Sequence, residues 1–268
     1  MRMGYAFQRT SYASLVRAPG TLRGPRLARR EAGAEGVLLL GQGEYELLWG
    51  DRSRPGRGRP SGLTRERIVA EAVAIADAEG LHKVSMKHLA DRLGSGVMSL
   101  YRHVPGKDEL VILMYDSLMD GPPDLPDADT WRDVLLHWGR TVIGLFRAHP
   151  WAITVGTSAR TMGPGEAGWV DHVLGRLGAL GLPADLGLMA VLTVDCFALG
   201  AARPETGGAG SSAEFFSFLA DPAAGARFPH LAAVTTASFA SEQLLEDYFE
   251  FGLQRVLDGL EQYIDARA

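Results

Sequence analysis

The sequence predicts an all-α protein built from a small N-terminal head and a larger helical body. Apolar residues recur at helical spacing along most of the chain, and no stretch alternates with the two-residue period of a strand. Basic residues also gather in one short segment. We expect an Arg- and Gly-rich, poorly ordered extension with a basic linker at residues 1–60, the head at 61–120 and the body at 121–268.

The first two head helices carry their own start and stop signals. Thr64 can cap a helix whose apolar residues continue to Ala76, and Gly80 ends it. The pattern then repeats, because Ser85 can cap a second helix that stops at Gly94.

A tight turn at residues 94–96 (Gly-Ser-Gly) leads to a short helix from about Val97 to His103. Val104 and Pro105 close that helix, since a residue before proline avoids helical geometry. A fourth helix opens near residues 106–109, where two acids suit the positive helix end.

The sequence of the body also predicts helices throughout. After a break at residues 121–126 (GPPDLP), the sequence predicts helices at roughly 130–148, 151–158, 165–180, 184–202, 213–220 and 241–264. We expect the loop at 203–212 to be mobile.

Composition narrows the class of protein. With 46% apolar and 22% charged residues, the 268-residue chain is globular in type. Its one cysteine, Cys196, leaves no internal disulfide and no zinc site made of cysteine pairs, and we expect it to be a buried apolar residue. We find neither an apolar run of the ~18 residues that a membrane helix needs nor a signal peptide, which favours a cytoplasmic protein.

Charge is divided unevenly along the chain. Residues 52–107 hold eleven Lys or Arg and five Asp or Glu, a formal charge of +6, whereas residues 108–268 sum to −13. A basic head on an acidic body favours a polyanionic partner for the head alone. Two helices joined by a glycine turn also form a helix-turn-helix, which lays its second helix, here 97–103, in the DNA major groove.

The head resembles the TetR family of transcriptional regulators. The resemblance rests on residues 75–81 (IADAEGL), 84–94 (VSMKHLADRLG) and 99–110 (SLYRHVPGKDEL), and it extends over 47–119. It is weaker in the body, through Trp131-Arg132, residues 149–151 and residues 249–260. The family implies a homodimer that binds operator DNA, a small-molecule effector in the body, and repression that the effector relieves.

The resemblance also implies roles for residues in the head. It places groove-facing or phosphate-binding side chains at Lys87, Val97, Met98, Ser99, Tyr101, His103 and Lys107. The linker residues Arg54, Arg57 and Arg59 are candidates for a minor-groove arm, although a solvated linker explains them equally well. Where family members often have a hydroxyl cap, this chain has Gly96, which caps only slightly less well.

Two body helices, 184–202 and 241–264, are too apolar to be covered by one protomer, so we expect them to pair with their copies in a dimer. The candidate interface residues are Met189, Leu192, Tyr248, Phe249, Val256 and Leu260. A cavity for an apolar or aromatic effector is expected between that pair and residues 130–180. Its candidate lining residues are His137, Trp138, Phe146, Trp151, Met162, Trp169, His172, Asp195 and Phe197.

Other functions stay open at this point. A transcriptional activator or a DNA-binding protein without a ligand fits the head equally well. A helical enzyme is the alternative from another class, but the sequence shows no nucleophile elbow, paired carboxylates or phosphate-binding loop, so we expect no catalysis. We also expect no cofactor and no metal, because His137, His149 and His172 lack the spacing of a metal site.

Overall fold

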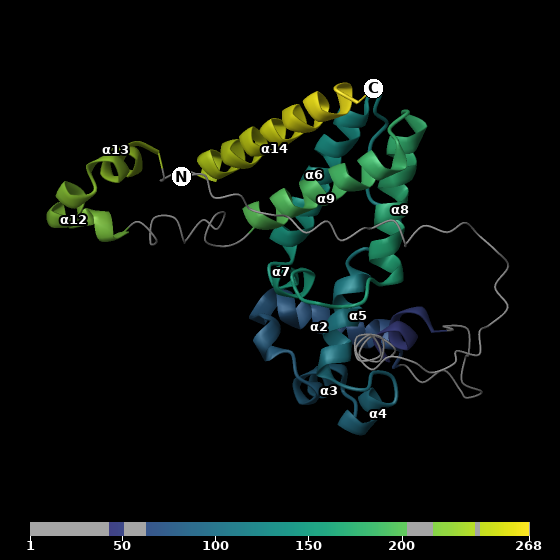
Figure 1. The fold of residues 1–268 in the computed structure, drawn as a ribbon. Helices are drawn as coiled ribbons and strands as arrows, with labels where there is room; N and C mark the ends of the chain where they lie inside the picture. Colours follow the sequence, from purple (N-terminus) through teal and green to yellow (C-terminus); the bar gives the residue numbers. More distant parts are fainter. Residues whose placement is uncertain (1–42, 51–62, 203–216, 239–241, 268) are drawn as a thin grey trace, which may run out of the picture. The chain divides into compact units, whose positions relative to one another are not determined.

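The computed structural model describes residues 43–50, 63–202, 217–238 and 242–267, and within these ranges it contains helices and no strand (Figure 1). The expected all-α class is therefore confirmed. The predicted minor-groove arm at Arg54, Arg57 and Arg59 and the loop at 203–212 lie outside the described residues.

In the head, local capping sets the helix ends. The Thr64 side chain accepts a hydrogen bond from the Arg67 amide and starts α2 (Arg65–Glu79), and Ser85 does the same from the His88 amide for α3 (Met86–Leu93). A short 3₁₀ turn, η2 (Leu81–Lys83), joins them. Gly94 ends α3 in the left-handed conformation, with φ 61°, which glycine adopts without steric cost.

The helix-turn-helix is completed by α4 (Val97–Tyr101), which Gly96 begins without a side-chain cap. Leu100 is fully buried, so the rest of this short helix faces outward or sideways. The next helix, α5 (Lys107–Ser117), contacts α2 in the head and both α7 and α8 in the body. It therefore links the two parts of the molecule (Figure 1).

The body consists of longer helices packed side by side. They are α6 (Trp131–Ala148), α7 (Ala152–Gly156), α8 (Pro164–Ala179), α9 (Ala184–Ala201) and α14 (Glu242–Asp265). Helix α9 lies against α6, α8 and α14. The close approach needs Gly139 on α6, because a Cβ there would lie 3.0 Å from Leu253 and 3.1 Å from Val194.

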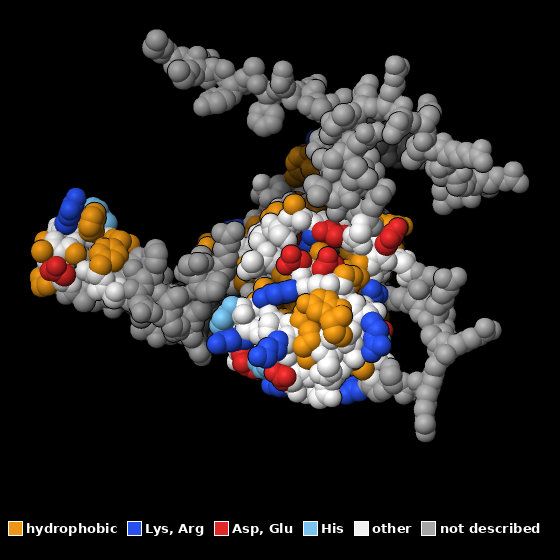
Figure 2. Space-filling view, turned by 90° about the horizontal axis from the view of Figure 1, so that it is seen from below, with side chains coloured by type: hydrophobic (Ala, Val, Ile, Leu, Met, Phe, Trp, Pro, Cys, Tyr) orange, Lys and Arg blue, Asp and Glu red, His pale blue; other side chains and the backbone are white. Residues whose placement is uncertain are grey.

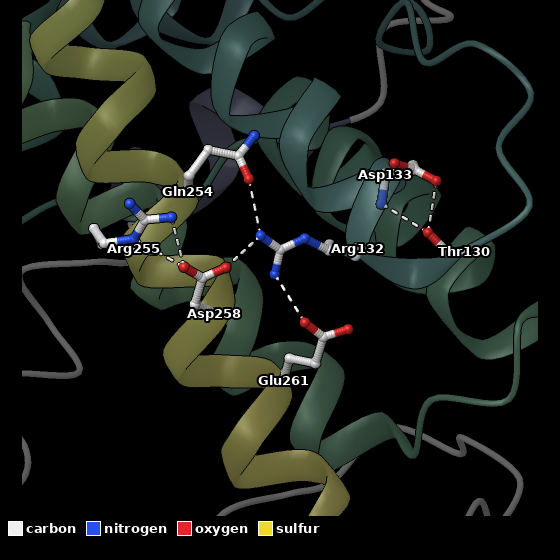
Figure 3. A network of polar contacts seen from close by, with 7 residues as sticks. All are labelled: Thr130, Arg132, Asp133, Gln254, Arg255, Asp258 and Glu261. Atoms are coloured by element: carbon white, nitrogen blue, oxygen red, sulfur yellow. Dashed lines mark hydrogen bonds and ion pairs between the residues drawn. The ribbon is translucent and has the colours of Figure 1, made fainter.

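Polar contacts fasten α14 to α6 at its solvent edge (Figure 3). The Arg132 guanidinium donates to Gln254, Asp258 and Glu261, at 2.8, 2.6 and 3.1 Å. The hydrogen bonds that Asp258 accepts from Arg132 and Arg255 hold the pKa of its carboxyl below the ordinary value. Nearby, Arg140 binds both oxygens of Glu250 at 2.8 Å. These pairs fix the register of α14 on α6.

An additional helix at 43–49 lies within the segment that the sequence predicted to be poorly ordered, so that prediction is wrong for these residues. Leu47 and Leu48 are buried in the core. The free energy of burying these side chains offsets the conformational entropy that the short segment loses when it becomes ordered. Its carbonyl at Leu47 accepts from Arg65 of α2, and its Trp49 Nε1 donates to the Met162 carbonyl at 2.9 Å. It therefore contacts both the head and the segment before α8.

Three further expectations need correction. Residues 217–220 form a 3₁₀ turn, η3 (Ser217–Ala220), and the sequence did not predict α12 (Pro222–Arg227) or α13 (Pro229–Ser238). Cys196 of α9 is exposed rather than buried. Helix α9 itself is long and apolar enough to cross a membrane by length and composition, which the sequence reading missed; it packs instead against three body helices.

Candidate functional site

The exposed end of the head combines an apolar patch with Lys and Arg side chains. Figure 2 views this end and shows an apolar patch with Lys and Arg side chains beside it, together with some Asp and Glu side chains. Met98 of α4 is 76% exposed and Tyr101 is 44% exposed, so both offer apolar surface to a partner. Lys87 of α3 and Lys107, the first residue of α5, are also exposed.

Other candidate head residues are only partly exposed. Val97, Ser99 and His103 are half-buried at the edges of α4. The Ser99 hydroxyl oxygen accepts a hydrogen bond from the Arg102 guanidinium at 2.9 Å, so its position is fixed while its own proton stays available for donation. Arg92 has a different role, because it pairs with Glu71 of α2 at 2.8 Å.

A cavity of about 230 Å³ lies in the body between α5, α6, α8 and α9. Four of the predicted lining residues meet there, namely Trp138, Phe146, Trp169 and Asp195. Trp138 and Trp169 form an edge-to-face pair with centroids 6.0 Å apart. The wall is therefore mostly aromatic.

Two acids also line this cavity. Asp195 accepts a hydrogen bond from Trp138 Nε1 at 2.7 Å, and burial raises the pKa of its carboxyl to about 6 even though that hydrogen bond opposes the shift. Glu166 accepts two hydrogen bonds from Arg160, at 2.5 and 2.8 Å. The Arg160 guanidinium in turn lies over the ring of Tyr115, 4.1 Å from its centroid.

Sequence reasoning missed Tyr115, Met119 and Glu166 as lining residues. Tyr115 and Met119 come from the C-terminal end of α5 and the residues after it, a region assigned to the head, and only the packing of α5 on α8 brings them into the body. Burial raises the pKa of Tyr115 to about 12, with Glu166 adding to the shift. Met119 lies beyond the end of α5 at Ser117, so helical spacing alone does not place it beside Tyr115.

Five predicted lining residues do not line this cavity. Trp151 Nε1 donates to Asp77 of α2 at 2.7 Å, so its side chain is turned toward the head. Met162 is exposed beside Trp49, and the His137 ring faces the Asp133 carbonyl of its own helix. Phe197 stacks on Phe249, with ring centroids 5.7 Å apart. The Phe197 ring also lies against Gly252, where an added Cβ would be 2.4 Å from that ring.

The fifth, His172, lines a larger hollow of about 780 Å³ between α2, the end of α5 and the start of α8. Here Asp116 is buried, and its carboxylate accepts from the amides of Gly165 and Glu166 at 3.0 and 3.2 Å. It thereby caps the first turn of α8 from another helix. Glycine is needed at 163 and 165, because a Cβ would lie 2.1 Å from the Asp116 carboxylate and 2.5 Å from its carbonyl oxygen respectively.

The outer faces of α9 and α14 leave apolar residues uncovered. Met189, Leu192 and Tyr248, which we predicted at a dimer interface, are all at least half exposed, and Leu192 also borders the cavity. Val256 and Leu260 are partly buried against the core. Phe249 is the exception, because it is 2% exposed within its own protomer and has almost no surface to offer a partner.

Comparison with known proteins identifies both parts of the chain. The family described as "Bacterial regulatory proteins, tetR family" matches residues 68–114, and "Tetracyclin repressor-like, C-terminal domain" matches residues 122–264. The HTH-type transcriptional repressor DrrR1 of Streptomyces coeruleorubidus is 39% identical, with 83% of this chain and 86% of the relative covered.

Solved structures agree with this assignment. ActR of Streptomyces coelicolor in complex with actinorhodin is 27% identical, with a TM-score of 0.58 over 76% of this chain and 99% of ActR. ActR in complex with (S)-DNPA is 25% identical, with a TM-score of 0.60 over 76% of this chain and all of ActR. The chain belongs to the TetR family and is a helix-turn-helix transcriptional regulator.

Proposed function

We propose that this regulator is a homodimeric repressor that binds operator DNA through residues 61–120 and leaves it when a small apolar or aromatic molecule enters the body, residues 121–268. It would act by binding, without catalysis, in the cytoplasm where its operator lies. The single observation that carries the DNA-binding part is the exposed apolar surface of α4 with Lys and Arg side chains beside it.

The geometry of the head supports different DNA contacts for its exposed and half-exposed residues. Val97 and Met98 offer apolar contact to thymine methyl groups, and Ser99, held by Arg102, can donate to a base edge. Lys87 can reach a guanine or a phosphate from α3. Tyr101, His103 and Lys107 would bind phosphates, with Lys107 adding its charge to the amides at the start of α5.

The cavity is connected to the DNA-binding surface through α5. Lys107 begins this helix, and Tyr115 in its last turn lines the cavity. Asp116, one residue further, caps α8, whose Glu166 and Trp169 line the opposite wall. A ligand that moves Tyr115 or α8 would therefore shift α5 and the spacing of the two heads.

Between the two hollows, the smaller cavity is our candidate for the effector. Its aromatic wall and few polar groups match the composition of small-molecule sites, whereas several charged residues line the larger hollow. The cocrystallised ligands of ActR support a ligand-responsive body in this family.

The dimer is proposed from the uncovered apolar faces of α9 and α14. Pairing these helices with their copies would bury Met189, Leu192 and Tyr248, and it would set the two heads on successive major grooves, roughly 34–36 Å apart. Sedimentation of the purified chain should give the mass of two chains, and a monomer at micromolar concentration would contradict this part.

Footprinting and in vitro transcription from the protein's own promoter region test repression. A repressor protects DNA that overlaps the polymerase site and lowers transcript yield, whereas an activator protects DNA upstream of that site and raises it. A thermal-shift screen of small aromatic compounds against the dimer then identifies molecules that bind. Such a compound should restore transcription, and compounds that bind with no effect on DNA release would contradict the ligand-responsive part.

A further inference from the structure

The charge balance of the cavity is the feature that points further. Its two carboxylates are Asp195 and Glu166, and the guanidinium that pairs with Glu166 belongs to Arg160. Across the described part of the chain, no Lys or Arg forms an ion pair with Asp195, whose recorded partner is the neutral indole N–H of Trp138. The cavity therefore has one negative charge without a matching cation.

The walls around that charge are aromatic. Trp138, Trp169, Tyr115 and Phe146 all line the cavity. Aromatic faces attract cations and also pack against flat apolar groups. The cavity already shows this preference, because the Arg160 guanidinium lies over the Tyr115 ring. One carboxylate inside an aromatic wall is a combination that favours a cation over an anion.

We propose that the effector is a flat aromatic molecule with a protonated amine, whose ammonium group pairs with Asp195 while its rings pack against the Trp138 and Trp169 side chains that line the cavity. This inference rests on the proposed ligand-responsive function and adds the charge of the ligand to it. A neutral alcohol of the same shape would keep the packing and lose the ion pair. A carboxylate of the same shape would face Asp195 and Glu166 and be repelled.

The size of the cavity sets the scale of the ring system. At about 230 Å³ it is smaller than the roughly 300–1,000 Å³ of drug-sized sites, so a two-ring compound is a suitable probe. We choose 1-naphthylmethylamine as the cation, 1-naphthalenemethanol as its neutral counterpart and 1-naphthoate as the anion. These three share one ring system and differ in charge.

The experiment measures the affinity of the full-length protein for each probe by calorimetry at neutral pH. The amine should bind at least about tenfold more tightly than the alcohol, because its ammonium group forms an ion pair with the Asp195 carboxylate, whereas the alcohol offers only a neutral hydroxyl donor. Naphthoate should bind most weakly. An alcohol that binds as tightly as the amine, or a naphthoate that binds more tightly, overturns the proposal.

The variant Asp195→Asn identifies the residue responsible. Its amide oxygen can still accept from Trp138, so the fold is expected to be retained, and the thermal unfolding midpoint checks this. The preference for amine over alcohol should fall to about one, with the affinity for the alcohol unchanged. Asp185→Asn is the matched control, since it removes an exposed acid from the same helix outside the cavity. A preference that survives in Asp195→Asn contradicts the proposal.

Two further readouts keep the result interpretable. If Asp195→Asn does not fold, lowering the pH of the wild-type protein protonates Asp195, and the preference for the amine should then shrink; a constant preference overturns the proposal. Affinity for a promoter fragment, measured on the same preparations, separates the two ideas. Intact DNA binding without an amine preference contradicts only the ligand charge, whereas absence of DNA binding contradicts the proposed function itself.

Discussion

The head and the body are held together in different ways. Thr64 and Ser85 start their helices through hydrogen bonds three residues away, and Gly94 stops one through its own left-handed conformation. In the body, the decisive polar contacts join residues far apart in sequence, such as Asp195 with Trp138 and Arg132 with Asp258. Structure in the head is therefore encoded locally, whereas the body and its cavity depend on how distant helices pack.

The largest expected effect tests the helix at 43–49, which lies upstream of both family-matched segments. Leu48 is 1% exposed, so Leu48→Ala should lower the free energy of unfolding by about 2–5 kcal/mol. Urea denaturation measures this. The matched control is Glu46→Ala, an exposed position on the same helix, which should change stability by less than about 0.5 kcal/mol. Equal, small effects of both variants would mean that this helix contributes nothing to the fold.

The next effect concerns the long-range contacts of the body. Burial raises the pKa of Asp195 to about 6 in the folded protein, above its ordinary value of 3.8, so the folded state holds this proton more tightly than the unfolded chain. The stability that this proton contributes is present at low pH and is lost as pH rises from about 4 to about 6. Asp195→Asn should therefore gain stability relative to wild type over that window, by up to roughly 3 kcal/mol at neutral pH.

Urea denaturation of the wild type and of Asp195→Asn at several pH values gives this difference directly. Asp185→Asn, whose carboxylate is exposed, serves again as the control and should show no such rise. A stability difference between Asp195→Asn and wild type that stays constant across the window would show that folding does not shift the pKa of the half-buried Asp195.

A smaller effect is expected for local capping in the head. Thr64→Ala removes the acceptor for the Arg67 amide and should lower stability by about 1 kcal/mol. Thr64→Ser keeps the hydroxyl and should be close to wild type, which thermal unfolding can check. If the serine variant is as unstable as the alanine variant, the threonine contributes through its methyl group and not through the cap.

The smallest effect on affinity is expected for base reading. Ser99→Ala removes a hydroxyl that can bind one base edge, so it should change the order of preference among operator variants with little loss of overall affinity. Competition binding with a set of operator sequences measures this order. Ser117→Ala, at the far end of α5, should leave it unchanged. An unaltered order in Ser99→Ala would remove this residue from the base-reading set.

The contrast between head and body also explains what the sequence could predict. Caps, glycines and the helical period act over a few residues, so the head helices and most body helices could be anticipated. The sequence assigned Phe249 to the dimer interface and Trp151 to the cavity. In the structure, Phe249 stacks on Phe197, whose ring lies against Gly252, and Trp151 donates a hydrogen bond to Asp77 of α2. Periodicity indicates that a side chain is buried and not which neighbour buries it.

The same limit applies to the helix at 43–49 and to the cavity. Leu47 and Leu48 form too short an apolar run to indicate a helix alone, and they are ordered because α2 and the residues before α8 offer contacts. Tyr115 reaches the cavity because Asp116 caps α8 from another helix. Neither contact leaves a local pattern in the sequence.

The salt dependence of binding to the protein's own promoter region tests the central claim most directly. Affinity should fall steeply with salt concentration, and Lys107→Ala should weaken binding to all sequences while reducing the logarithmic slope by about 0.9, the value of one phosphate contact. Arg267→Ala, a cation at the end of the body, should leave the slope unchanged. No salt-sensitive affinity for any fragment of that region would contradict the account.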